Sequence, residues 1–164
     1  MRIPRLGVLA LLVLAAVVVG AVAVSQGSAG GSGVQTITFV IPDAGGSFHF
    51  VDNRPVQGDP EEEPPTAGDI FVGSQKLFTK DGRRAGTLGF QCVFATGGTK
   101  PRGECTGSYG LRGGTIFLQA AFVGEQKIRI AVTGGSGAYE GVRGSVSERD
   151  TRTGSIDTVR LTRG

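Results

Sequence analysis

The feature that most constrains this chain is a glycine-rich segment, residues 134–146 (GGSGAYEGVRGSV), preceded by an alternating apolar run over 128–132. The alternation is typical of a strand with one buried face. Glycine adopts positive φ without a steric cost, so three glycines and a serine at 134–137 predict a turn. The segment therefore predicts a strand, a glycine hairpin against which Tyr139 packs, and a second strand.

The same pattern, apolar alternation interrupted by glycine, recurs through most of the chain. The 164 residues include 29 glycines, which fall between runs rich in Val, Ile, Phe and Thr. In that setting they indicate hairpin turns and strand bends, and no window shows a 3.6-residue period with helix caps. We predict strands at 34–41, 47–51, 69–79, 84–95, 103–111, 115–123, 127–133, 141–148 and 156–163, with a charged loop at 149–155.

Short turns between consecutive strands predict an up-and-down antiparallel sheet. About eight main strands is the number at which such a sheet closes into a barrel with room for one small ligand. Closure also removes the exposed strand edges that promote aggregation. The predicted fold class is all-β, an eight-stranded antiparallel barrel over residues 34–164. An open sandwich is the alternative.

Two cysteines flank one predicted hairpin. If Cys92 and Cys105 face each other, the hairpin centres on Gly98 and Thr99, inside a segment (96–102) whose composition independently predicts a turn. Facing residues of antiparallel strands project to the same side, at a separation that a disulfide can bridge. We therefore predict a Cys92–Cys105 disulfide, which fits an oxidising compartment.

The N-terminal segment predicts export. Two arginines precede an apolar run from Leu6 to Val24, the pattern of a secretory signal peptide. Small residues at the end of the run predict cleavage after Ala23, so that 1–23 is removed and a Gly/Ser linker over 24–33 precedes the barrel. The run is also about long enough to span a bilayer. The alternative to a secreted protein is therefore an uncleaved anchor, its only membrane contact, with the barrel outside the cytoplasm.

Charge and ligand counts exclude several classes of function. Removing Arg2 and Arg5 from the 17 basic residues leaves 15 against 14 acidic ones, with no basic stripe, which argues against a nucleic-acid partner. One histidine and two cysteines are too few for a zinc site. The acidic run at 61–63 lies between prolines and favours a solvated loop over a calcium site. We expect neither a metal nor a cofactor.

Candidate functional residues lie on the faces that should line the barrel. Tyr109 shares a strand face with Cys105, and Phe90 shares one with Cys92, so both side chains are expected at the cavity. Tyr109 would either donate a hydrogen bond to a ligand or fill space and bond to the backbone. His49, the only imidazole, is either an acid–base group or ligand contact, or an ordinary surface residue.

The glycine-rich segment resembles the G-G-(S/T)-G-x-(Y/F)-x-x-(A/V)-R-G signature of dirigent proteins and the related allene oxide cyclase barrels. Further similar stretches are GDIF at 68–71, DGRRAG at 81–86, the cysteine hairpin and LRGGTI at 111–116. Together they resemble the secreted bacterial branch of this group, over roughly residues 39–146.

The resemblance implies a calycin-like barrel, often a homotrimer, with an apolar cavity for a small hydrophobic or phenolic partner. Members steer the coupling or cyclisation of reactive intermediates by holding one conformer in a dry pocket. The match implies an isomerase-like or dirigent-type role for Arg143, and for Asp52 beside the aromatic run 48–50. Ala138 stands where dirigent proteins often carry an acid, so the alternative is a non-catalytic binding or cell-surface protein on the same barrel.

Overall fold

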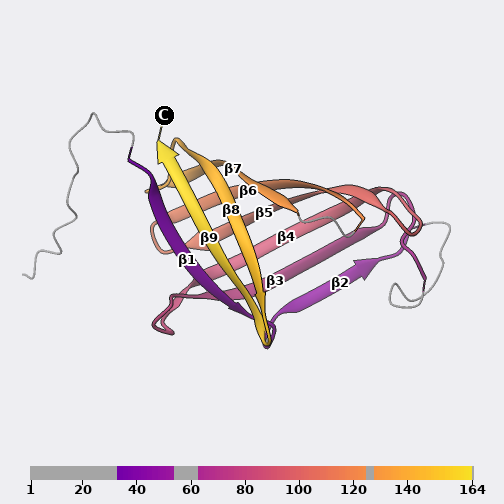
Figure 1. The fold of residues 1–164 in the computed structure, drawn as a ribbon, viewed down its shortest axis with the longest axis horizontal. Helices are drawn as coiled ribbons and strands as arrows, with labels where there is room; N and C mark the ends of the chain where they lie inside the picture. Colours follow the sequence, from indigo (N-terminus) through magenta and orange to yellow (C-terminus); the bar gives the residue numbers. More distant parts are fainter. Residues whose placement is uncertain (1–32, 54–62, 125–127, 164) are drawn as a thin grey trace, which may run out of the picture. The chain divides into compact units, whose positions relative to one another are not determined.

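The computed structural model describes residues 33–53, 63–124 and 128–163, and their regular structure is entirely β-strand (Figure 1). The predicted signal segment 1–23, the linker up to residue 32 and part of the acidic run 61–63 lie outside the described residues. No helix in the described ranges has the length and apolar character needed to cross a membrane. The strands are β1 (Gln35–Pro42), β2 (Ser47–Val51), β3 (Ile70–Phe78), β4 (Arg84–Thr96), β5 (Arg102–Leu111), β6 (Gly114–Val123), β7 (Arg129–Gly137), β8 (Val142–Thr151) and β9 (Gly154–Arg163).

The sheet closes through β1. Consecutive strands from β3 to β9 pair antiparallel, and β1 pairs with β9 along its whole length. Val40 of β1 also pairs with Phe78 of β3, which closes a ring of eight strands. The predicted eight-stranded antiparallel barrel is confirmed, and the open sandwich is excluded. The ninth strand, β2, pairs only with the first half of β3, beyond the end of β1.

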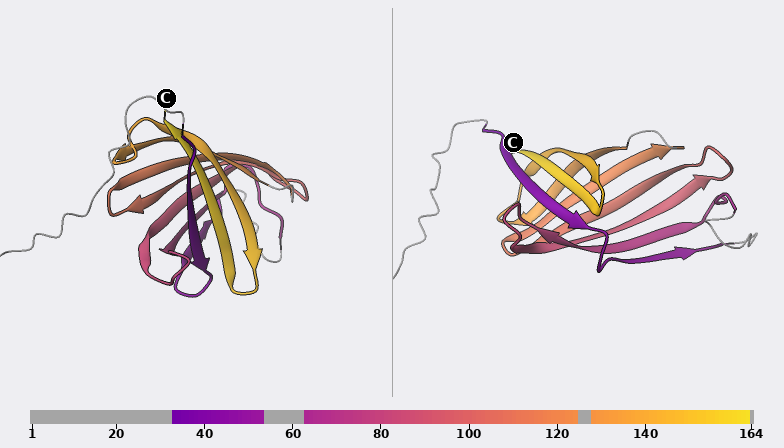
Figure 2. Two further views of the ribbon diagram at one scale, coloured as in Figure 1. Left: turned by 60° about the vertical axis from the view of Figure 1, so that its left-hand side comes forward. Right: turned by 60° about the horizontal axis from the view of Figure 1, so that its bottom comes forward.

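The core lies where β1, β8 and β9 cross over β3–β7, as the two views in Figure 2 show. Alternate residues of these strands point inward, so each strand contributes one apolar face. β7 and β8 pair at only three positions. Side-chain packing, more than backbone hydrogen bonding, therefore holds these two strands together. The buried apolar cluster consists of Phe39, Ile41, Leu77, Tyr109, Ile116, Leu118, Val132, Val142, Val146, Val159 and Leu161.

The glycine-rich segment does not form its turn where we predicted it. Residues 134–137 continue β7, and the turn lies at 138–141. A Cβ atom at Gly135 would lie 2.3 Å from the Tyr139 carbonyl oxygen and 2.8 Å from that of Thr115. These glycines therefore allow close approach of neighbouring backbones rather than the reversal itself. Tyr139 packs against the core, as predicted.

The charged segment 149–155, predicted as a loop, instead lengthens the β8–β9 hairpin. β8 continues through Thr151 and β9 begins at Gly154, so a turn of only two residues joins them. The pattern was missed because the extension carries charged rather than alternating apolar side chains. In the register of the two strands, Glu148 lies directly opposite Asp157.

Asp69 ties together the two ends of the segment between β2 and β3. Its side chain, in a residue 1% exposed, accepts hydrogen bonds from the amide of Asn53 (2.8 Å) and from the amide (2.6 Å) and hydroxyl (3.1 Å) of Thr66. The Asn53 side chain in turn donates to the carbonyl oxygen of Gly68. Burial alone raises the pKa of the Asp69 carboxyl, but the hydrogen bonds from Thr66 and Asn53 outweigh it and the pKa is lowered.

We expect Asp69→Asn to lower the free energy of unfolding by about 1–3 kcal/mol at pH 7, because the amide cannot accept all three bonds. A pKa lowered in the folded state means that the carboxylate stabilises the protein above its unfolded-state pKa. This contribution is lost as the pH falls through the folded-state pKa. Urea unfolding from pH 7 down to pH 2 should show wild type and variant converging at the acid end. The exposed Asp43→Asn is the control, and a deficit independent of pH would contradict the assignment.

Candidate functional site

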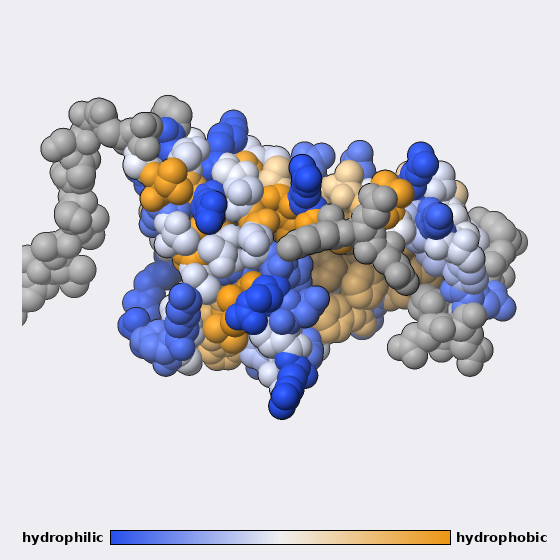
Figure 3. Space-filling view, viewed as in Figure 1, coloured by the Kyte–Doolittle hydropathy of each residue, from blue (hydrophilic) through white to orange (hydrophobic). Residues whose placement is uncertain are grey.

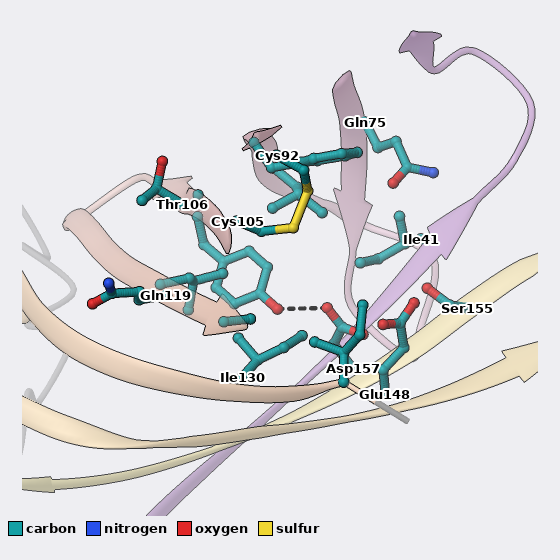
Figure 4. Close-up of a pocket in the computed structure, with 17 residues that line it drawn as sticks. Ile41, Gln75, Cys92, Cys105, Thr106, Gln119, Ile130, Glu148, Ser155 and Asp157 are labelled. Carbon is teal, nitrogen blue, oxygen red and sulfur yellow. Dashed lines mark hydrogen bonds between the residues drawn. A yellow bond between two sulfur atoms is a disulfide. The ribbon is translucent and has the colours of Figure 1, made fainter. Parts of the chain in front are cut away.

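A cavity of about 200 Å³ lies inside the barrel beside the core (Figure 4). Each of the eight strands of the closed ring contributes to its lining, so the site exists only once the ring has formed. Most of the wall is apolar, so it would cover mainly the apolar part of a bound molecule. Its apolar lining residues include Ile41, Leu88, Phe90, Leu118 and Ile130, together with the Cys92–Cys105 disulfide.

A tyrosine and an aspartate meet at the wall of this cavity. Tyr109 is 0% exposed, and its hydroxyl donates to Oδ2 of Asp157 at 2.5 Å, the dashed line in Figure 4. The Tyr109 ring packs against Phe39, with 5.1 Å between ring centroids, which holds the phenol in place. Asp157 is 3% exposed, and its other oxygen, Oδ1, has no hydrogen-bond partner among the described residues. That oxygen is therefore an unused hydrogen-bond acceptor on a residue that lines the cavity.

A second carboxyl stands beside this pair. Glu148 of β8 is the register partner of Asp157 and also lines the cavity, although it is more exposed. Burial raises the pKa of Asp157, and the bond from Tyr109 offsets this only in part. Burial, followed by the negative charges of Asp157 and Asp150, raises the pKa of Glu148. Neighbouring carboxyls of this kind exchange protons with a ligand more readily than ordinary surface acids.

The phenol of Tyr109 is a fixed donor in this group. Burial, and then the charge of Asp157, raises its pKa, so the hydroxyl keeps its proton. The cavity thus combines one permanent hydrogen-bond donor with two acids of adjustable protonation. No three acidic, cysteine or histidine side chains within the described ranges lie close enough together to hold a metal ion.

The structure brings some of the residues singled out from the sequence into the cavity. Tyr109 and Phe90 both line it. The Cys92–Cys105 disulfide is also present, with an S–S distance of 2.02 Å and the two cysteines opposite each other in the β4–β5 register. Such a bond is compatible with an extracellular protein.

Three other candidate residues do not line the cavity. His49 is exposed on the outer face of β2 and lies within hydrogen-bond distance of the Ser47 hydroxyl. Arg143 points out of the barrel because its neighbour Val142 points in, and its guanidinium donates to the Val142 carbonyl oxygen. Asp52 follows β2, is partly buried, and is not among the residues that line the cavity.

Asp157 and Glu148, the two acids of the site, were missed in the sequence. A signal was present, since Asp157 extends the inward alternation of Val159 and Leu161 by one step. Glu148 similarly follows Val146 on the inward face of β8. Burying an acid is costly, so an acid that continues an apolar stripe inward indicates a position that lines a cavity rather than the packed core.

Phenylalanine rings continue the cavity wall along β2–β6. Phe90 packs on Phe71 (5.7 Å between centroids) and on Phe48 (6.3 Å). Further along the same strands, Phe94 packs on Phe50 (6.2 Å) and Phe122 (5.3 Å). In Figure 3 an apolar hollow lies between the β8–β9 hairpin and the far end of the sheet. The cavity therefore has an aromatic extension on the inner face of the sheet.

Fold and site together define an antiparallel β-barrel with an internal apolar cavity that contains a phenol and two acids. No family model and no curated protein matches the chain. A solved structure titled "Pyocyanin demethylase" is similar, with a TM-score of 0.62 and 24% identity over 78% of this chain and 100% of that one. A nonspecific heme-binding cyclase, described as catalysing a 4 + 2 cycloaddition in neoabyssomicin biosynthesis, has a TM-score of 0.52 and 16% identity. That alignment covers 81% of this chain and 67% of the cyclase.

At these identities the likeness shows the fold. Both structures place this chain among the barrel proteins, which agrees with the barrel implied by the sequence resemblance but does not single out the dirigent or allene oxide cyclase group.

Proposed function

We propose that this protein is a secreted barrel that binds a small, flat, largely apolar or phenolic molecule and directs its cyclisation or another proton-assisted rearrangement. The observation that carries the proposal is the buried, unpartnered Oδ1 of Asp157 in an apolar cavity. A buried polar atom without a partner costs about 1–3 kcal/mol. A ligand whose polar group reaches this atom would recover that cost, so the cavity favours an apolar molecule with one well-placed polar group.

The side chains that line the cavity have different roles in such a reaction. Phe90 and the aliphatic walls hold the ligand in one orientation and keep water out, which favours one reactive conformer. The Tyr109 hydroxyl holds Asp157 in place, and Asp157 and Glu148 supply and accept protons at the ligand's polar group. The demethylase and cyclase titles of the two similar structures support a small-molecule site of this kind.

A non-catalytic binding or surface protein on the same barrel is the alternative. Converging polar groups in a cavity favour catalysis, and the described lining of this cavity has three ionisable ones: Tyr109, Asp157 and Glu148. The missing acid at Ala138 does not weigh against activity, because Ala138 lies in the β7–β8 turn and does not line the cavity. Native mass spectrometry of protein purified from its own source tests the proposal directly. A co-purifying aromatic molecule would support it, and incubation of that molecule with the protein and with Asp157→Asn would report turnover.

Two neighbouring alanines provide a matched test of cavity binding. Ala120 lines the cavity and is 8% exposed, whereas Ala121 faces outward on the same strand. We expect Ala120→Phe to fill the cavity and to weaken binding of 2-naphthol, a flat phenolic probe, by at least about tenfold, a loss of about 1.4 kcal/mol. Ala121→Phe should bind the probe like the wild type in a fluorescence titration.

Unfolding curves of both alanine variants check that the barrel is intact, because overpacking costs about 1–3 kcal/mol. If Ala120→Phe does not fold, the smaller Ala120→Val replaces it. Unchanged affinity in a folded Ala120 variant would place the probe outside the cavity.

A further inference from the structure

The described part of the cavity lining contains acidic groups but no basic side chain. Among the described lining residues these are Tyr109, Glu148 and Asp157, with no lysine, arginine or histidine. The basic residues of the two adjoining strands, such as Arg143 and Arg160, are exposed on the outer face. An anionic ligand would meet carboxyl groups and no counter-charge, so the cavity disfavours carboxylates and phosphates.

Among the described residues, the strands packed against Asp157 place no basic side chain in the cavity lining. β5 contributes the Tyr109 hydroxyl, and β8 contributes Glu148, with Asp150 further along the same strand. From β1 the register partner is the apolar Phe39. Asp157 is 3% exposed and its Oδ1 is unpartnered, so the missing contact is one that a ligand's hydrogen-bond donor would supply.

The aromatic wall of the same cavity also favours a cation. Phe90 lines the cavity, and its ring contacts those of Phe48 and Phe71. The face of an aromatic ring attracts a cation, and the attraction grows when water is excluded. An acid pair next to aromatic walls therefore suits a positively charged nitrogen on a flat body better than a neutral polar group.

We infer that the cavity selects ligands that carry a protonated nitrogen, an ammonium or a protonated heteroaromatic nitrogen, whose N–H donates to Asp157 Oδ1 beside Glu148. The inference rests on the proposed cavity binding and narrows it to one chemical class. The positive charge on the ligand compensates one carboxylate, and the ring system lies against the Phe90 side of the cavity.

Three matched probes separate charge from shape: 2-naphthylmethylammonium, 2-naphthylmethanol and 2-naphthoate, titrated calorimetrically at pH 7 into the disulfide-bonded protein. We expect the ammonium to bind at least about tenfold more tightly than the alcohol, and the carboxylate to bind most weakly. Asp157→Asn, which can still accept the Tyr109 hydrogen bond, should reduce the preference for the ammonium over the alcohol to less than threefold. Glu104→Gln, on the exposed face of β5, is the control and should change neither. If Asp157→Asn does not fold, Glu148→Gln at the more exposed acid takes its place.

Acridine gives a second readout, because its fluorescence differs between its neutral and protonated forms. A tenfold preference for the cation corresponds to an acridine pKa raised by about 1 unit on binding. Equal affinity for ammonium and alcohol, tighter binding of naphthoate, or an acridine pKa that does not rise would overturn the inference and leave cavity binding standing. Failure of all three naphthyl probes to bind would overturn both the inference and the proposed function.

Discussion

Replacing Gly144 with alanine should lower the free energy of unfolding by about 3–5 kcal/mol or prevent folding. Gly144 lies in β8 with a φ of 155°, and a Cβ atom there would sit 1.8 Å from the carbonyl oxygen of Arg160. That oxygen belongs to the backbone of β9, so it cannot move aside without disturbing the β8–β9 ladder. Gly144 is also one of only three β8 residues that pair with β7, so the same substitution disturbs a part of the ring that has few paired residues.

Gly89 provides the matched control for this experiment. It is also a strand glycine, but a Cβ atom there has no neighbour within 4 Å and its φ is not in the left-handed region. Gly89→Ala should change stability by no more than about 1 kcal/mol, and a small gain is expected because alanine restricts the unfolded chain. Urea unfolding of both variants measures the difference. A Gly144→Ala protein as stable as Gly89→Ala would mean that β8 and β9 do not approach as closely as described.

Loss of the Cys92–Cys105 disulfide should lower the free energy of unfolding by about 3 kcal/mol. The bond links residues 13 positions apart, and a closed loop of that size removes conformational entropy chiefly from the unfolded chain. Cys92→Ala/Cys105→Ala and reductant-treated wild type should both show the loss in urea unfolding at pH 7. The same reductant should leave the double variant unchanged. If the double variant unfolds at the wild-type urea concentration, the bond does not stabilise the fold.

The disulfide also bears on the binding site, because both cysteines line the cavity. Their removal should therefore weaken 2-naphthol binding more than the small change in side-chain volume suggests, since β4 and β5 lose a covalent tie beside Phe90. The predicted pairing from the hairpin register was correct because a hairpin is a local structure. Its turn and its two strands are contiguous in the chain, and each register position follows from the turn.

Much of the candidate site could not be predicted from such local patterns. Tyr109 was found from its alternation with Cys105, but its partner Asp157 is 48 residues away in sequence. Glu148 was placed just before a predicted loop, whereas pairing with β9 extends its strand past it. The resemblance pointed to Arg143, yet the burial of Val142 turns the arginine outward. Only the Tyr109–Asp157 contact joins strands that are distant in the sequence, whereas Glu148 and Arg143 were misjudged because the charged β8–β9 hairpin hides the inward alternation of β8.

The amino-acid sequence by itself determined the all-β class, most of the strands and the disulfide, because alternation, turn composition and hairpin register are properties of short segments. Only the tertiary structure decided the ring closure at Val40 and Phe78, the close-approach role of Gly135 and Gly144, and the meeting of Tyr109 with Asp157. These features depend on which distant backbones come within a few ångströms of each other once the barrel closes. No local pattern encodes that distance, since it is set by the combined packing of strands from both ends of the chain.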